Sequence, residues 1–262
     1  TRRERLQVLT SLAAHHIPGA PQPAGSPIII APARALMART LPRREFLKAA
    51  RMLRRGETLV TNAVIQRWVA LGYEAENTVI TPGQFARRGG ILDIWPPAEP
   101  LPVRIELFGD EIETLRAFDP ATQRTAQSRL ERLLVTPARE FILPEAAAEA
   151  ASPDEISEFN IPLLNAGPAS LLDYLPKSSL VLLDDQQAIQ DAISEIEEQA
   201  VGMRRDLVAE GSLAEDFPIP YLTWTEIADS LPRLTALELS ASAEAPEETP
   251  SRLAGCFSAG PR

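Results

Sequence analysis

Residues 103–118 have the sequence Val-Arg-Ile-Glu-Leu-Phe-Gly-Asp-Glu-Ile-Glu-Thr-Leu-Arg-Ala-Phe. Apolar side chains stand at every second position from Val103 to Leu107, which is the pattern of a strand with one buried face. Gly109-Asp110 then suits the two-residue turn of a β-hairpin. Ile112 continues the apolar face on the returning strand. The stretch therefore predicts an antiparallel hairpin with one face on a core.

The other face of this hairpin carries an aromatic ring among charged groups. By the alternation, Phe108 shares that face with Arg104. The other charged positions on it are Glu106, Glu111 and Glu113. A large apolar ring on a charged sheet face is typical of a protein-binding surface. The alternative is that Arg104 only pairs with Glu106 or Glu113 across the hairpin, and that Phe108 folds against a helix.

Further short strands and turn residues surround the hairpin. We expect strands at residues 79–80, 85–87, 91–95, 103–108, 112–118 and 133–135, joined by Pro, Gly and Asp turns. Upstream, apolar periodicity predicts helices at residues 33–40, 43–55 and 61–71. Together these patterns predict an antiparallel meander whose apolar face is covered by the preceding helices.

A second set of elements has the order of a parallel α/β fold. Residues 28–31 and 180–183 are apolar runs that suit buried parallel strands. A long amphipathic helix is predicted after residue 185, with Met203 among its inward positions, and a further strand at 234–239. Strand followed by helix predicts a doubly wound element.

The composition excludes several classes of function. The 262 residues have a formal net charge of −10, which argues against a dominant nucleic-acid-binding surface. Cys256 is the only cysteine, so no internal disulfide can form, which suits a reducing compartment, the cytoplasm. No run of about 20 apolar residues is present, so no membrane span is expected. The opening Thr-Arg-Arg-Glu-Arg suggests an internal fragment of a longer protein.

Asp184-Asp185 ends an apolar strand, as the acidic residues of a Walker B motif do. The sequence lacks a Gly-x4-Gly-Lys-Ser/Thr phosphate loop that would cradle a nucleotide. We interpret the pair as a degenerate Walker B remnant, and we expect Asp185 and the residues after it to serve the N-terminus of the following helix. His15-His16 has no third ligand at metal spacing. We therefore expect no catalytic residue, no metal and no cofactor in this chain.

Residues 73–143 resemble the UvrB-interaction module of bacterial transcription-repair coupling factors, which also occurs in the excision-repair protein UvrB. The resemblance rests on the hairpin and on residues 83–96, Gly-Gln-Phe-Ala-Arg-Arg-Gly-Gly-Ile-Leu-Asp-Ile-Trp-Pro. Trp95 and Leu107 depart from the family, which usually has Phe at both places.

The resemblance implies a fold and a division into domains. The fold class is α/β, an incomplete RecA-like domain with an inserted helix-plus-antiparallel-sheet UvrB-interaction module. The expected domains are the end of the first half of the RecA-like domain at 1–41, the module at 42–138, the second half of the RecA-like domain at 139–239, and a linker with the start of a next domain at 240–262.

The resemblance also implies a partner and a site. The partner is UvrA, and the implied contact residues are Arg88, Arg104 and Phe108. Glu106, Glu111 and Glu113 would form a secondary interface. The parent protein would bind RNA polymerase and double-stranded DNA, and ATP and Mg²⁺ are expected only in its translocase part, C-terminal to this segment.

Two other interpretations stay open. One is that the chain is a piece of UvrB, an ATP-dependent helicase. Residues 123–125, Gln-Arg-Thr, disfavour this interpretation because they resemble the coupling factor and not UvrB. The missing phosphate loop disfavours it as well. The other is a nucleic-acid-binding module that acts without UvrA, which would show a steep dependence of DNA binding on salt.

Overall fold

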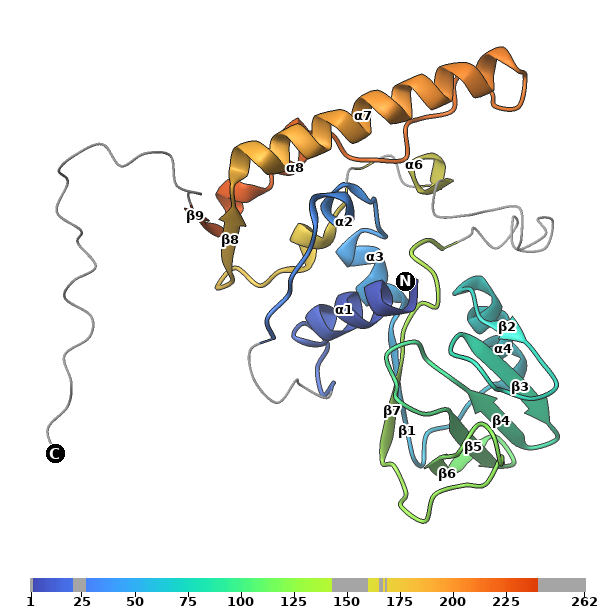
Figure 1. The fold of residues 1–262 in the computed structure, drawn as a ribbon. Coiled ribbons are helices and arrows are strands. Elements are labelled where there is room, and N and C mark those ends of the chain that lie inside the picture. The colour runs from blue at the N-terminus through green and yellow to red at the C-terminus, as the bar shows by residue number, and fades with distance from the viewer. Residues whose placement is uncertain (1, 21–26, 143–159, 165–166, 168, 240–262) are drawn as a thin grey trace, which may run out of the picture.

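The computed structural model describes residues 2–20, 27–142, 160–164, 167 and 169–239. A twisted sheet with one covering helix lies at one end, short helices lie in the middle, and a two-stranded sheet with a long helix lies at the other end (Figure 1). None of the helices in the described part combines the length and apolar character needed to cross a bilayer. The predicted linker at 240–262 lies outside the described residues.

The predicted hairpin forms two strands of a five-stranded sheet. The sheet has the order β2 (Glu74–Ala75), β3 (Gln84–Arg88), β4 (Ile91–Ile94), β5 (Val103–Phe108) and β6 (Glu111–Ala117). β3 to β6 are antiparallel neighbours in chain order, so the predicted meander is confirmed for these strands, while β2 adds in parallel at the edge. The predicted strand at 79–80 is wrong. Val79 is fully buried from a loop, where it packs against Trp95 and Phe118.

One face of this sheet packs on α4 (Thr61–Ala70), as predicted. Val64 and Trp68 stand four residues apart on the helix, so both point at the sheet and both are buried. The ring of Trp68 meets Phe85 edge-on, with 5.6 Å between the ring centroids. Burial of each such side chain contributes about 1.5–3 kcal/mol. We call this side of the sheet the inner face.

β1 (Arg51–Arg54) and β7 (Arg132–Val135) form a separate antiparallel ribbon that leads into and out of the sheet. The prediction of one helix over residues 43–55 is wrong in its second half, because α3 (Arg43–Ala49) ends at Ala49. Leu53 is buried as expected, but it lies on a strand paired with Leu133. A distant strand partner thus overrides the local helical periodicity. For the same reason the predicted strand at 133–135 joins β1 and not the meander.

The helices in the middle connect the sheet to the other end of the molecule. They are α1 (Arg2–Ala14), α2 (Ala33–Met37), α3, α6 (Ile161–Leu164) and the 3-10 turn η2 (Leu171–Tyr174). Phe46 and Tyr174 pack edge to face at 5.6 Å in their core. Arg5 binds the buried Glu140 at 2.7 Å, which ties α1 to the chain leaving the sheet.

The second α/β body contains the predicted strand, helix and strand. It comprises β8 (Leu180–Asp184), α7 (Gln186–Ala209), α8 (Trp224–Ala228), the 3-10 turn η3 (Leu231–Arg233) and β9 (Thr235–Leu239). β8 and β9 are parallel and adjacent, so the mixed α/β class is confirmed. Ile193 of α7 is buried, but Met203 is exposed, against the prediction.

The predicted buried strand at 28–31 is wrong. Ile28 and Ile30 are 91% and 92% exposed, and the segment belongs to none of the sheets in the described residues. An apolar run becomes a buried strand only where a sheet is present to receive it. The β8–β9 sheet has two strands and does not reach this segment.

Candidate functional site

The face of the five-stranded sheet opposite α4 carries the predicted contact residues. Cross-strand register places Phe108 beside Glu111, and Asp93 between Ala86 and Arg104. Because residues in register share a face, these side chains lie on the side away from the core. Phe108 is 80% exposed, so the alternative in which its ring folds against a helix is wrong. We call this side the outer face.

Phe108 stands at the end of a hairpin that is held on both sides. Gly109 has φ +62, a conformation that glycine adopts without strain, and it begins the two-residue turn. The segment before α4 runs along the returning strand: Leu59 N donates to Asp110 O at 2.6 Å, and Ile112 N donates to Glu57 O at 2.9 Å. These bonds fix the backbone that presents the ring, so little ordering is left for a partner to impose.

The turn that follows Arg88 touches the strand that carries Phe108. Leu107 N donates to Gly90 O at 2.8 Å. A Cβ on Gly90 would lie 3.2 Å from Leu107 O, which explains a glycine at this close approach. Gly89 has φ +61. The Arg-Gly-Gly turn and the aromatic end of β5 are therefore one continuous piece of surface.

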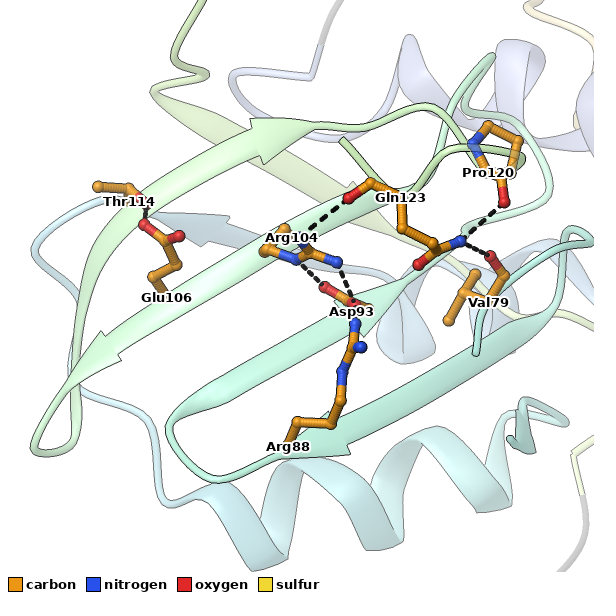
Figure 2. Close-up of polar contacts among 8 residues, drawn as sticks. All are labelled: Val79, Arg88, Asp93, Arg104, Glu106, Thr114, Pro120 and Gln123. Carbon is orange, nitrogen blue, oxygen red and sulfur yellow. Dashed lines mark hydrogen bonds and ion pairs between the residues drawn. The ribbon is translucent and has the colours of Figure 1, made fainter. Parts of the chain in front are cut away.

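Arg104 is less accessible than the alternation suggested. Its side chain is 15% exposed, so the expectation that it stands open to solvent beside Phe108 is wrong. Nε donates to Asp93 Oδ1 at 2.8 Å and Nη2 donates to Asp93 Oδ2 at 2.9 Å, a bidentate pair (Figure 2). The guanidinium also lies 4.8 Å from the centroid of the Phe118 ring. The hydrogen bonds to Asp93 are the main cause that raises the pKa of Arg104.

A loop closes over Arg104 from the end of β6. Gln123 has φ +61, and its backbone oxygen accepts a hydrogen bond from Arg104 Nη1 at 3.3 Å. Its side-chain Nε2 donates to Pro120 O at 2.7 Å and to Val79 O at 3.2 Å (Figure 2). Beneath this loop Phe118 packs with Val79 in a small cluster on the outer face. This half of the outer face is therefore covered by the chain itself.

Arg88 reaches the same carboxylate from the other side. Its Nη2 donates to Asp93 Oδ2 at 2.6 Å, and its side chain is 50% exposed (Figure 2). Asp93 itself is 1% exposed. The structure thus brings Arg88 and Arg104 together on a residue that the prediction of contact residues missed. The available signal was Asp93 itself, a charged residue in the apolar strand Ile-Leu-Asp-Ile with arginines on both neighbouring strands.

The three predicted secondary residues have different surroundings. Glu106 is half-buried and accepts a hydrogen bond from Thr114 Oγ1. Glu111 is exposed at the hairpin end. Glu113 is exposed at a β-bulge. Glu106 pairs with Thr114 and Leu107 pairs with Ile112, so Glu113 between them has no partner on β5. Arg104 pairs with Asp93, so the alternative in which it pairs only with Glu106 or Glu113 is wrong.

Asp184 and Asp185 lie far along the chain from this surface, at the start of α7. Asp184 is the exposed last residue of β8. Asp185 is the N-cap of α7: it has φ +57, and its Oδ1 accepts from Ala188 N at 3.0 Å. The predicted role of Asp185 at the helix N-terminus is confirmed. No group of three or more potential metal-binding side chains is present among the described residues.

The comparisons with known proteins cover the same surface. The model of the UvrB interaction domain family matches residues 52–141. The chain is 31% identical over 235 residues to a transcription-repair-coupling factor of Bacillus subtilis, covering 75% of this chain and 20% of that protein. It is 34% identical over 141 residues to the factor of Myxococcus xanthus, covering 53% of this chain and 12% of that protein.

The UvrABC system protein B of Prochlorococcus marinus strain MIT 9313 is also similar. It is 41% identical over 107 residues, which cover 41% of this chain and 16% of that protein. The chain therefore spans about a fifth or less of the length of these curated relatives. Every residue of the outer face described above lies within the segment that the family model matches.

Proposed function

We infer that this chain, which carries a UvrB interaction domain over residues 52–141, is the UvrA-recruiting part of a transcription-repair coupling factor. The observation that carries the inference is the 80% exposed Phe108 ring, held at a fixed hairpin end beside a half-exposed arginine. An apolar anchor next to an arginine is the composition of a protein-binding hot spot. The function is therefore recruitment of a repair protein in nucleotide excision repair coupled to transcription.

The extent of similarity favours the coupling factor over UvrB. The match to the Bacillus subtilis factor covers 75% of the chain, whereas the match to the Prochlorococcus marinus protein B covers 41%. The second α/β body, with β8, α7 and β9, lies downstream of the family segment. A piece of UvrB remains the second candidate, because the same domain occurs in both kinds of relative.

Phe108 and Arg88 would act in different ways on UvrA. Phe108 would enter an apolar pocket, where removal of its exposed surface from water drives association. Arg88 would face a carboxylate, for which its planar guanidinium is suited. Glu111 and Glu113 are exposed at the rim, where charges change association rate and selectivity more than affinity.

The second α/β body is proposed to be an incomplete RecA-like domain around the module at 42–138. Four leucines of the parallel pair β8–β9 are about half exposed on one face, namely Leu180, Leu182, Leu237 and Leu239. Parallel sheets are normally buried on both faces, so this surface suits completion by further elements of a longer polypeptide. The motor, with ATP, Mg²⁺, RNA polymerase and double-stranded DNA as its ligands, would lie in the rest of the parent.

A binding measurement with purified UvrA tests the proposal. The chain is titrated with UvrA by calorimetry, and Arg88→Ala is compared with Arg205→Ala, an 80% exposed arginine of α7. We expect saturable binding that Arg88→Ala weakens and Arg205→Ala leaves unchanged, and UvrB should compete. Absence of binding, or equal effects of both substitutions, would contradict the assignment. Binding to duplex DNA with a steep salt dependence, without UvrA binding, would instead support a nucleic-acid-binding module.

A further inference from the structure

One buried carboxylate collects three guanidinium hydrogen bonds from two strands. Asp93 is 1% exposed, on the central strand β4, and it accepts from Arg104 Nε and Nη2 and from Arg88 Nη2. A buried carboxylate is retained in a fold only when it is paired and hydrogen-bonded. The sheet register explains the convergence: Arg104 is directly opposite Asp93, and Arg88 is on the diagonal from β3.

The two arginines are not equivalent in this cluster. Arg104 is held by three residues: both carboxylate oxygens of Asp93, the backbone oxygen of Gln123 and the ring of Phe118. Arg88 lies at the open side of the cluster, with half of its side chain exposed (Figure 2). Glu106 also interacts electrostatically with Arg104. Arg88 is therefore the arginine of the cluster whose positive charge is exposed to solvent.

The cluster also fixes where that charge lies relative to Phe108. Arg88 is joined to β4 through Asp93, and the turn that follows Arg88 is joined to β5 by the hydrogen bond from Leu107 N to Gly90 O. An arginine held in one orientation loses less conformational entropy when a partner binds than one that moves freely. The carboxylate of Asp93 is buried, so it can hold the guanidinium of Arg88 from behind and leave the exposed side of that guanidinium free for a partner.

We propose that Asp93 is the positioning residue of the UvrA-binding surface: it holds the guanidinium of Arg88 in the orientation that contacts the partner. Arg104 would act through Asp93, by fixing the position of its carboxylate. The proposal rests on the proposed function, because it concerns the same surface. It assigns Asp93 no contact with UvrA. It also changes the role of Arg104 from a direct contact to a support.

A double-mutant cycle on the whole chain tests this role. UvrA affinity is measured for the wild type, Asp93→Asn, Arg88→Gln and the double variant. Asp93→Asn removes a negative charge, so by net charge alone it would tighten binding to an acidic partner. We expect the opposite, a loss of about tenfold, and we expect a further loss of less than about twofold when the substitution is made in the Arg88→Gln background.

The possible results separate the two proposals. If Arg88→Gln does not weaken binding, the proposed function of this surface fails. If Arg88→Gln weakens binding but Asp93→Asn has the same effect in both backgrounds, the function stands and the positioning role is overturned. Tighter binding of Asp93→Asn also overturns it. Arg205→Gln serves as the matched control for an exposed arginine.

A measurement on the wild-type chain keeps the proposal testable if Asp93→Asn does not fold. Nitrogen relaxation of the arginine Nε–H groups reports how restricted each side chain is. We expect Arg88 to be restricted nearly as much as Arg104, and far more than Arg205, although Arg88 is half exposed. If the side chain of Arg88 moves as freely as that of Arg205, Asp93 does not position it.

Discussion

Replacement of Phe108 by alanine separates binding from folding more clearly than any other substitution in this chain. A phenylalanine side chain offers about 200 Å² of surface, and with 80% of Phe108 exposed only about 40 Å² is removed from water on folding. At about 25 cal/mol per Å², the substitution costs about 1 kcal/mol of unfolding free energy. Phe118 is fully buried ten residues later, and its replacement should cost about 3–5 kcal/mol.

Phe108→Ala should have a small effect on folding but a large effect on UvrA binding. An aromatic hot spot costs about 2 kcal/mol or more when truncated, which corresponds to about a thirtyfold loss of affinity. The assay is calorimetric titration with UvrA for binding, with urea unfolding for stability. Met203→Ala on α7 is the matched control, because Met203 is also an exposed apolar side chain, at 68%.

Two results would refute the reasoning for Phe108. If Phe108→Ala lowers the unfolding free energy as much as Phe118→Ala, the ring is part of a core in solution. If the affinity for UvrA changes no more than for Met203→Ala, the ring is exposed without being a contact. The combination of a small loss of stability, about 1 kcal/mol, with strongly weakened binding is expected only of an exposed contact residue.

Three further predictions follow from other contacts. Arg104→Ala should lower the unfolding free energy by about 3 kcal/mol in urea unfolding, because it breaks a buried ion pair. Lys48→Ala, which breaks an exposed ion pair, should change the unfolding free energy by less than about 0.5 kcal/mol. Equal effects of the two substitutions would mean that Arg104 is solvated. Hydrogen bonds from the Thr122 backbone and side chain lower the pKa of Asp119, so this contribution to stability is present above the unfolded pKa of about 3.9 and is lost as the pH falls through the lower folded pKa. Asp119→Asn should therefore make the unfolding midpoint between pH 5 and pH 2 less sensitive to acid, and an unchanged profile would contradict this. Asp185→Ala should lower the unfolding free energy by about 1–2 kcal/mol, since it removes the N-cap of α7 at a residue in the left-handed conformation. Asp184→Ala should be nearly neutral, and thermal unfolding of both variants checks the difference.

Several elements could be predicted because their signals are local. The alternation from Val103 to Leu107 sets which side chains face the core, and Gly109 supplies the turn, so β5 and β6 form where expected. The i, i+4 spacing of Val64 and Trp68 likewise predicts α4 and its buried face. The exposure of Phe108 follows from the same alternation, since no other phase would bury the apolar residues of β5.

The errors arise where a distant part of the chain decides the outcome. Residues 51–54 have helical periodicity, yet they pair with β7 as a strand. The apolar run at 28–31 is extended and exposed, because the sheet that it would suit is not built from the described residues. In both cases the local pattern is compatible with more than one structure, and tertiary contacts select among them.

The order of the residues is enough to specify the meander, its covering helix and the exposed ring, because strand alternation and helical spacing are properties of neighbouring positions. Which charges meet is a different matter. Asp93 lies on β4, Arg88 on β3 and Arg104 on β5, and only the strand register brings the two guanidinium groups onto the one carboxylate. Register depends on cross-strand hydrogen bonds between separate segments, so the buried cluster exists only once the sheet has formed.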